Sequence, residues 1–253
     1  MHRSDAQLNS SIAIVIPCND EEARISSTIR TIIDYMKDKS WSWEMIVVDD
    51  GSLDSTKEKA LAAAAGNDRV SVSRYEDNHG KGWALRKGFS LSRSDYVLFC
   101  DADLSTPIDE LADFLERAAE GYDLVVASRV GEQARILVPQ TFARRLAGRA
   151  FRAAVGGMNL EASDTQCGFK LLRRATLEPV IEACETDGFA FDVELLLRAQ
   201  LAGLRSVDYP VHWSDAAGSK LKLFRDGPRA IADLLRIRKM AKSLRRSDSS
   251  RPR

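Results

Sequence analysis

The chain has 253 residues, 44% of them hydrophobic, and its 37 basic and 37 acidic side chains give a formal net charge of zero. This balance argues against a nucleic-acid-binding protein and predicts one globular unit with a sizeable core. The first 11 residues lack the apolar segment of a signal peptide, and no apolar run reaches the roughly 18 to 20 residues of a membrane span. The four cysteines form no Cys-x-x-Cys pair, which favours a reduced, cytoplasmic protein.

Short apolar runs alternate with segments of helical periodicity through the first half of the chain. The pattern predicts strands at 12–16, 44–48, 70–73, 96–100 and 124–127, with helices at 21–38, 54–65, 81–92 and 107–120. Continuous apolar strands separated by helices are typical of βαβ units, in which a mostly parallel sheet is buried on both faces. We therefore expect an α/β fold of the nucleotide-binding kind.

Polar side chains follow every one of these predicted strands. They are Asn19 to Glu21, Asp49 to Ser52, Asn78 to Gly82, Asp101 to Asp103, and Ser128 with Arg129. Ligands of such sheets bind beyond the carboxyl ends of the strands, so these side chains predict the position of a site. Neither a Gly-x-Gly-x-x-Gly nor a Gly-x-x-x-x-Gly-Lys-Ser/Thr motif is present, which disfavours dinucleotide oxidoreductases and P-loop enzymes.

Asp101 and Asp103 flank Ala102 directly behind an apolar run. In extended chain, residues two apart face the same side, so the two carboxylates would repel one another. Mg²⁺ or Mn²⁺ between them removes this repulsion, and Mg²⁺ is commonly shared between carboxylates and substrate phosphates. The alternative is a strand end without a metal, followed by a helix that starts at Thr106 and Pro107.

A basic amphipathic helix is predicted at about 141–155. Arg145, Arg149 and Arg152 fall within about 60° of one another, opposite an apolar side. Such a helix suits a membrane surface with anionic head groups, or it is an ordinary solvated face. Farther on, 213–226 is predicted to be a closing loop and 241–253 a basic, disordered tail.

The sequence as a whole resembles the inverting family 2 glycosyltransferases of GT-A fold, in particular polyprenyl- and dolichyl-phosphate glucosyl- and mannosyltransferases. The matching segments run in order from about residue 12 to about residue 240: IAIVIPCNDEEARI, IVVDDGSLDST, NHGKGWALRKGF, VLFCDADLSTPIDEL, LVVASR, SDTQCGFKLLRR, GFAFDVELL and GSKLKLF. The resemblance implies a single GT-A domain over 12–240 behind a flexible N-terminus at 1–11.

The resemblance also implies a set of donor-binding residues. Asp101 and Asp103 would hold Mg²⁺ or Mn²⁺ on the diphosphate, and Asp103 would be catalytic. The nucleotide-sugar residues would be Pro17, Glu21, Asp50, Lys81, Asp101, Ala102, Asp103 and Lys220.

For the acceptor, the resemblance implies that Arg129 and Arg144 contact a lipid phosphate, and the basic helix adds Arg145 and Arg149. A phosphate monoester with a second pKa near 6 is mostly a dianion at pH 7, so its attack on the sugar needs cations more than a general base. Arg129 and Asp164 are expected to be catalytic, with Asp164 a base, a sugar ligand or a turn-capping residue.

Three positions depart from the family pattern, and several others stay open. Asn19 stands where the family usually has tyrosine, Ser105 where the mannosyl branch often has glutamine, and Gly148 where the family has serine. Asp192 and Glu194 would face either the sugar or the first turn of their helix. His212 is a further candidate metal ligand.

These expectations describe an enzyme that transfers a hexose to a polyprenyl or dolichyl phosphate at the cytoplasmic face of a membrane, with no expectation about its oligomeric state. UDP-glucose is the favoured donor, by resemblance to the glucosyltransferase branch, and GDP-mannose is the alternative. A soluble glycosyltransferase with a hydroxyl acceptor, with Asp164 or Asp192 as base, and a non-catalytic nucleotide-sugar-binding protein remain open.

Overall fold

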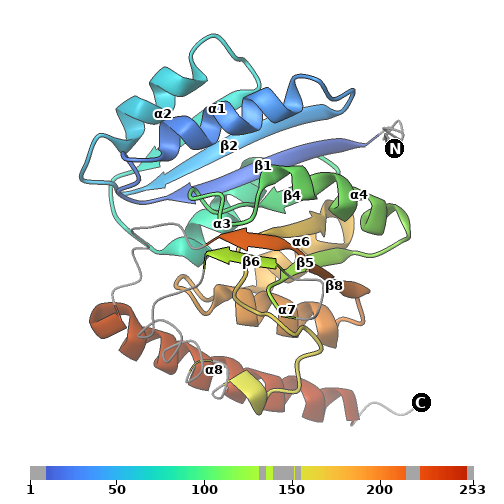
Figure 1. Cartoon of the computed structure of the whole chain (residues 1–253). Helices are drawn as coiled ribbons and strands as arrows, with labels where there is room; N and C mark the ends of the chain where they lie inside the picture. Colours follow the sequence, from blue (N-terminus) through green and yellow to red (C-terminus); the bar gives the residue numbers. More distant parts are fainter. Residues whose placement is uncertain (1–9, 131–134, 139–150, 152–154, 215–222, 250–253) are drawn as a thin grey trace.

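The computed structural model describes residues 10–130, 135–138, 151, 155–214 and 223–249. Its centre is a seven-stranded sheet with the order β3-β2-β1-β4-β7-β5-β8 (Figure 1). Only β7 runs antiparallel to its neighbours, β4 and β5, so the predicted mostly parallel sheet is confirmed. The strands are β1 (Ser11–Cys18), β2 (Ser42–Asp50), β3 (Val70–Tyr75), β4 (Tyr96–Phe99), β5 (Leu124–Ser128), β7 (Lys170–Arg173) and β8 (Ser206–Pro210).

Both faces of this sheet are buried. Ile12, Ile14 and Ile16 of β1 belong to the core on one face, and Ala13 and Val15 belong to the core on the other. Successive side chains of a strand point to opposite faces, so an uninterrupted apolar run fits a strand that is covered on both sides.

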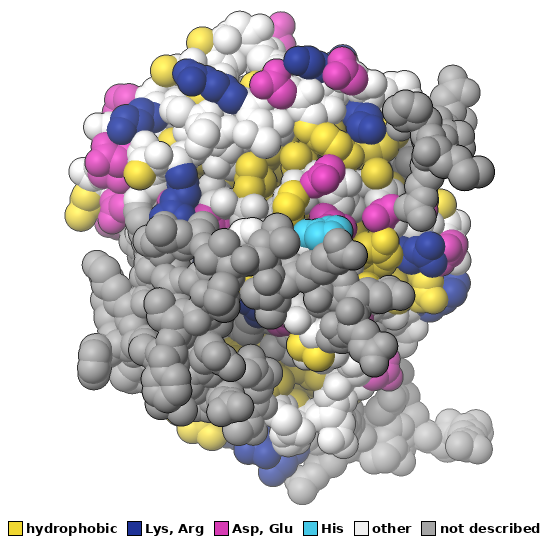
Figure 2. All heavy atoms as spheres, in the orientation of Figure 1, with side chains coloured by type: hydrophobic (Ala, Val, Ile, Leu, Met, Phe, Trp, Pro, Cys, Tyr) yellow, Lys and Arg dark blue, Asp and Glu magenta, His cyan; other side chains and the backbone are white. Residues whose placement is uncertain are grey.

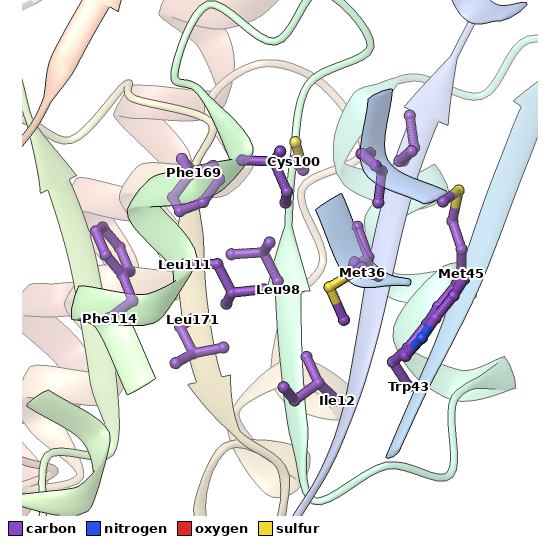
Figure 3. Packing of buried hydrophobic residues seen from close by; sticks show 14 of the residues in the cluster. Ile12, Met36, Trp43, Met45, Leu98, Cys100, Leu111, Phe114, Phe169 and Leu171 are labelled. Carbon is purple, nitrogen blue, oxygen red and sulfur yellow. The ribbon is translucent and has the colours of Figure 1, made fainter. Parts of the chain in front are cut away.

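Helices cover the sheet in two layers (Figure 1). The first core contains side chains of α1 (Ile25–Met36), α2 (Thr56–Ala64), and the 3₁₀ turn η1 (Ile108–Glu110) with α4 (Leu111–Ala119). Figure 3 shows Leu111 and Phe114 of this layer close to Leu98 and Leu171 of the sheet. The second core contains α3 (Lys81–Leu91), α6 (Arg174–Ala183) and α7 (Phe191–Leu201).

The last helix, α8 (Leu223–Ser249), packs on α7 outside the second layer. Leu234, Ile237 and Ala241 are buried against α7, with Val155 and Met158 in the same cluster. The predicted disorder of 241–253 is therefore wrong for residues 241–249, because the apolar stripe that anchors α8 extends to Ala241 and the helix continues beyond it. Ser11, placed in the flexible N-terminus, already belongs to β1.

A small second sheet was not predicted. It pairs β6 (Arg135–Val138) in parallel with β9 (His212–Ser214), so the expected closing loop at 213–226 begins as a strand. Residues 215–222 of that loop, and nearly all of the predicted basic helix at 141–155, lie outside the described residues.

The surface carries charges of both signs. On the face shown in Figure 2, acidic and basic side chains are interspersed over the α1 and α2 end of the molecule, as expected from a net charge of zero. Among the described residues, no helix combines the length and the apolar composition that a membrane crossing requires.

Candidate active site

A pocket opens at the carboxyl ends of β1, β2 and β4. It brings together seven of the predicted donor-site residues, which lie up to 86 positions apart in the sequence, because parallel strands all end at the same edge of the sheet. These residues are Pro17, Glu21, Asp50, Lys81, Asp101, Ala102 and Asp103. Their roles toward a ligand remain predictions.

Asp101 is paired with a cation from the neighbouring helix. The Lys81 ammonium, in the first turn of α3, lies 2.6 Å from Asp101 Oδ1. Burial alone would raise the pKa of Asp101, but the charge and hydrogen bond of Lys81 outweigh it and hold this pKa below its ordinary value. Gly168 lies against the carboxylate, since a Cβ there would fall 2.0 Å from Asp101 Oδ2. Any larger residue at position 168 would displace Asp101.

Asp103 lies farther from its cationic partner than Asp101 does. Its Oδ1 accepts the backbone N–H of Ser105 at 2.9 Å, and its Oδ2 lies 4.0 Å from Arg24 Nη1. Arg24 in turn contacts Glu21 at 2.7 Å. The segment after β1 and the turn after β4 that carries Asp103 are thus linked by one guanidinium, which also lines the pocket.

Asp101 and Asp103 can hold a divalent cation, provided that the ligand supplies the remaining oxygens. Among the described residues, no group of three His, Cys, Asp or Glu side chains forms a closed metal cage. Two carboxylates beside an open pocket fit Mg²⁺ or Mn²⁺, which take oxygen ligands and are commonly shared with substrate phosphates. His212, proposed as a further ligand, instead uses Nδ1 to contact Glu110 Oε1 at 2.7 Å.

On the β2 side of the pocket, the Asp50 carboxylate holds the loop before α3. It accepts the backbone N–H groups of His79 (3.0 Å) and Gly80 (2.6 Å). Burial raises the pKa of Asp50, while these two hydrogen bonds act in the opposite direction. Asn19, which replaces the expected tyrosine, lines the pocket and donates from Nδ2 to the carbonyl of Asp50. The ring of His79 stacks on Trp83 with centroids 4.2 Å apart.

Arg129 and Asp164 form a bidentate ion pair just beyond β5. Arg129 Nε and Nη2 donate to Asp164 Oδ2 and Oδ1 at 2.6 and 2.9 Å, and the Arg129 backbone N–H also donates to Oδ2. The guanidinium lies over the Trp213 ring at 5.3 Å. Burial would raise the pKa of Asp164, but Arg129 outweighs it and keeps the carboxyl ionised. We call Arg129, Asp164 and Trp213 the arginine clamp.

The clamp argues against Asp164 as a general base. Both of its oxygens are already hydrogen-bonded to a cation, and a pKa below the ordinary value makes a carboxylate a weaker proton acceptor. Charge from Arg129 also reaches Asp101 and helps to keep it ionised. The clamp and the pocket therefore belong to one electrostatic environment.

Asp192 and Glu194 do not line the described pocket. Asp192 is buried and accepts from the buried ammonium of Lys170 at 2.6 Å. Glu194 accepts the backbone N–H groups of Glu185 and Thr186 and pairs with Arg198. Both carboxylates have structural partners, so the expectation that they face the sugar is not supported for either.

Four predicted residues lie outside the described residues: Lys220, Arg144, Arg145 and Arg149. Conversely, the pocket includes residues that the sequence did not single out, namely Arg24, Gly188, Phe189, Arg229 and Asp233. Arg24 could have been found, because it lies three positions after Glu21 on a helix start and such pairs interact. Nothing in the sequence spacing links Asp233 to Asp103.

Comparison with known protein families identifies the family of this chain. The model of the family described as Glycosyl transferase family 2 matches residues 13–180. The chain belongs to this family. The pocket at the strand ends is thus the candidate active site of a family 2 glycosyltransferase, and the GT-A fold expected from the sequence is confirmed by solved structures.

Among curated relatives, glycosyltransferase AglD of Haloferax volcanii is 32% identical over 219 residues, covering 85% of this chain and 35% of AglD. The dolichyl-phosphate beta-glucosyltransferase of Homo sapiens is 31% identical over 242 residues, covering 90% of this chain and 74% of the relative. Glucosyl-3-phosphoglycerate synthase from Mycobacterium tuberculosis, crystallised with Mn²⁺, uridine diphosphate and glucosyl-3-phosphoglycerate, is 26% identical with a TM-score of 0.65. That match covers 94% of this chain and 86% of the synthase chain.

Proposed function

We propose that this protein is an inverting hexosyltransferase that moves glucose from UDP-glucose to a polyprenyl or dolichyl phosphate. The observation that carries the proposal is the arginine clamp, whose charge reaches Asp101, together with the pocket of Asp101, Asp103 and Lys81. It supplies a fixed cation for an acceptor phosphate next to a site suited to a nucleoside diphosphate. The name of the human relative supports this donor sugar and this acceptor.

On the donor side, Lys81 balances negative charge in the pocket, and Asp101 and Asp103 would hold Mg²⁺ or Mn²⁺. When bound, the cation would stabilise the negative charge of the departing diphosphate. The Mn²⁺ complex of the related synthase supports this cofactor. Lys220 and the nucleoside contacts of Pro17, Glu21 and Ala102 are part of the same proposal.

On the acceptor side, Arg129 would orient a phosphate that is already ionised. The engaged state of Asp164 favours this acceptor over a hydroxyl, because a hydroxyl acceptor needs a free base. Arg144, Arg145 and Arg149 would extend the cationic surface toward the lipid.

A lipid acceptor requires contact with a membrane, and α8 offers a suitable surface. Ile231 and Leu235 are 60% and 62% exposed on its outer side, and Lys239 and Lys242 are exposed beside them. At 100° per residue these four positions fall within about 80° of the helix circumference. Apolar side chains flanked by lysines suit an anionic bilayer, with peripheral attachment at its cytoplasmic face.

The function is tested with a matrix of UDP- and GDP-sugars against a short polyprenyl phosphate and, separately, a soluble hydroxyl acceptor. We expect UDP-glucose and the lipid to give turnover, Asp103→Ala to abolish it, and Arg129→Lys to lower it at least about 100-fold, because lysine lacks the planar fork. UDP binding should survive Arg129→Lys.

Each alternative has its own outcome in that matrix. Turnover with GDP-mannose would identify the mannosyl branch, and turnover with the hydroxyl acceptor alone would overturn the lipid acceptor. Binding of nucleotide sugars without turnover on any acceptor would identify a non-catalytic binding protein.

Membrane contact is tested by flotation with anionic and neutral vesicles. Lys239→Glu with Lys242→Glu should abolish binding to the anionic vesicles. The matched control, Lys37→Glu with Lys59→Glu, makes the same change in net charge on exposed positions of the α1 and α2 side and should leave binding intact. Equal loss in both double variants would mean that overall charge, and not the α8 surface, drives binding.

A further inference from the structure

One end of the pocket has no assigned role in the proposed reaction. Beyond Lys81 and Asp101, the lining passes to Gly188 and Phe189, which precede α7, and then to Arg229 and Asp233 on α8. In Figure 1, α8 lies alongside α7 on the side away from the sheet. This end is therefore built from elements far along the chain from the strand ends that carry the aspartates.

Asp233 has one carboxylate oxygen that no donor of the described residues contacts. Its side chain is 17% exposed, and Oδ2 is buried with no hydrogen-bond partner in the part of the chain that the structure describes. The nearest cation contact is Arg236 Nη2, 3.7 Å from Oδ1. Burial raises the pKa of Asp233, and Asp187 and Glu194 add to this effect, while Arg236 and Arg229 oppose it. Buried polar atoms are rarely left unpaired, so Oδ2 is suited to a ligand.

The position of Asp233 is fixed relative to the rest of the pocket. Arg236, one turn farther along α8, donates to Glu185 Oε2 at 3.0 Å and to Thr186 Oγ1 at 2.9 Å. The carbonyl of Asp187 in the same segment accepts the N–H of Gly82 at 2.7 Å, at the start of the helix that carries Lys81. Gly188 borders the carboxylate, since a Cβ there would lie at ordinary contact distance, 3.4 Å, from Asp233 Oδ2.

The chemistry at this end selects a neutral ligand that carries hydroxyl groups. Arg229 also lines this end, but a phosphate has no donor for the Asp233 carboxylate and would be repelled by it. An apolar group would leave Oδ2 without a partner, at the cost of an unsatisfied buried acceptor. A hexose offers adjacent hydroxyl donors for the carboxylate and a C–H face for the ring of Phe189, which also lines the pocket.

We propose that Asp233 accepts hydrogen bonds from hydroxyl groups of the donor hexose and is a specificity-determining residue for the sugar. The inference rests on the proposed function only in taking a nucleotide sugar as ligand. With this role for Asp233, α8 lines the sugar-binding part of the pocket and also presents an exposed side.

The test compares binding affinities by calorimetry in the presence of Mn²⁺. The ligands are UDP, UDP-glucose and its 2-, 3-, 4- and 6-deoxy analogues. In the unmodified protein, at least one deoxy analogue should bind about 10- to 100-fold more weakly than UDP-glucose, as expected for a lost hydrogen bond to a charged group. In Asp233→Ala that discrimination should fall to about 3-fold or less, while the affinity for UDP stays within about 3-fold.

A matched control separates the pocket from the anchoring of α8. Glu185→Gln removes the charge that pairs with Arg236 but does not line the pocket, so it should retain the full discrimination. If Asp233→Ala does not fold, Asp233→Asn serves instead, because its amide nitrogen replaces one acceptor oxygen with a donor.

Three results would overturn the inference: no discrimination among the deoxy analogues by the unmodified protein, unchanged discrimination in the Asp233 variant, or an equal loss of affinity for UDP itself. An equal loss of affinity for UDP would mean that Asp233 contacts the nucleoside diphosphate and not the sugar. Because these are binding measurements, failure to glycosylate polyprenyl phosphate would sink the proposed function and leave this inference standing.

Discussion

Two aspartate–cation pairs of the candidate site differ in how tightly they are closed. Asp101 meets Lys81 through Oδ1, and its side chain is 38% exposed. Asp164 holds Arg129 through both oxygens, is 8% exposed, and has Trp213 across the guanidinium face. The Asp101 carboxylate can therefore exchange its partner when a ligand arrives, whereas Asp164 serves to position Arg129.

Removing Asp164, the carboxylate of the closed pair, should change the stability of the protein most. Asp164→Ala leaves the Arg129 guanidinium largely buried without its partner, which should lower the free energy of unfolding by about 3 to 5 kcal/mol. Asp101→Ala is the matched comparison, and we expect a smaller loss of about 1 kcal/mol, because the exposed Asp101 carboxylate makes a single contact and Lys81 keeps the nearby charges of Asp192 and Asp103. Urea denaturation measures both, and equal losses would mean that the two pairs do not differ.

A smaller effect is expected from removing Lys81, the cation of the more exposed pair. Lys81→Met removes a positive charge next to Asp101, so the affinity for Mn²⁺ alone should rise about 10-fold while the affinity for UDP falls. Electron paramagnetic resonance of free Mn²⁺ measures the first change without any turnover. Lys87→Met, on the same helix but stacked over Trp83 outside the described pocket, is the control and should change neither affinity.

The smallest of these effects is a loss of folding stability at low pH. The pKa of Asp164 is lowered in the folded protein, so this group adds stability above its unfolded pKa of about 4 and loses it as the pH falls through the folded pKa. The difference in unfolding free energy between the unmodified protein and Asp164→Asn should be constant between about pH 5 and 8 and shrink below about pH 4. A difference that stays constant down to pH 3 would contradict the assigned role of the Asp164 charge.

Much of the pocket lining could be predicted from the sequence, because local rules govern it. The apolar runs ending at Cys18, Asp50 and Phe99 mark parallel strands, whose ends meet at one edge, so Glu21, Asp50 and Asp101 converge without any knowledge of long-range packing. The roles of Asp192 and Asp164 did not follow. Their partners Lys170 and Arg129 lie 22 and 35 positions away, and only packing decides such pairs.

Hydrophobic periodicity and turn residues are enough to specify the parallel sheet, its two covered faces and the edge where the polar strand ends gather. The folded structure sets which charges neutralise one another. It closed Asp164 on Arg129, paired Asp101 with Lys81, buried Asp192 on Lys170, and brought Asp233 of α8 to the same pocket as Asp103. Ion pairing depends on distances of a few ångströms between segments far apart in the chain, and no spacing in the sequence encodes those distances.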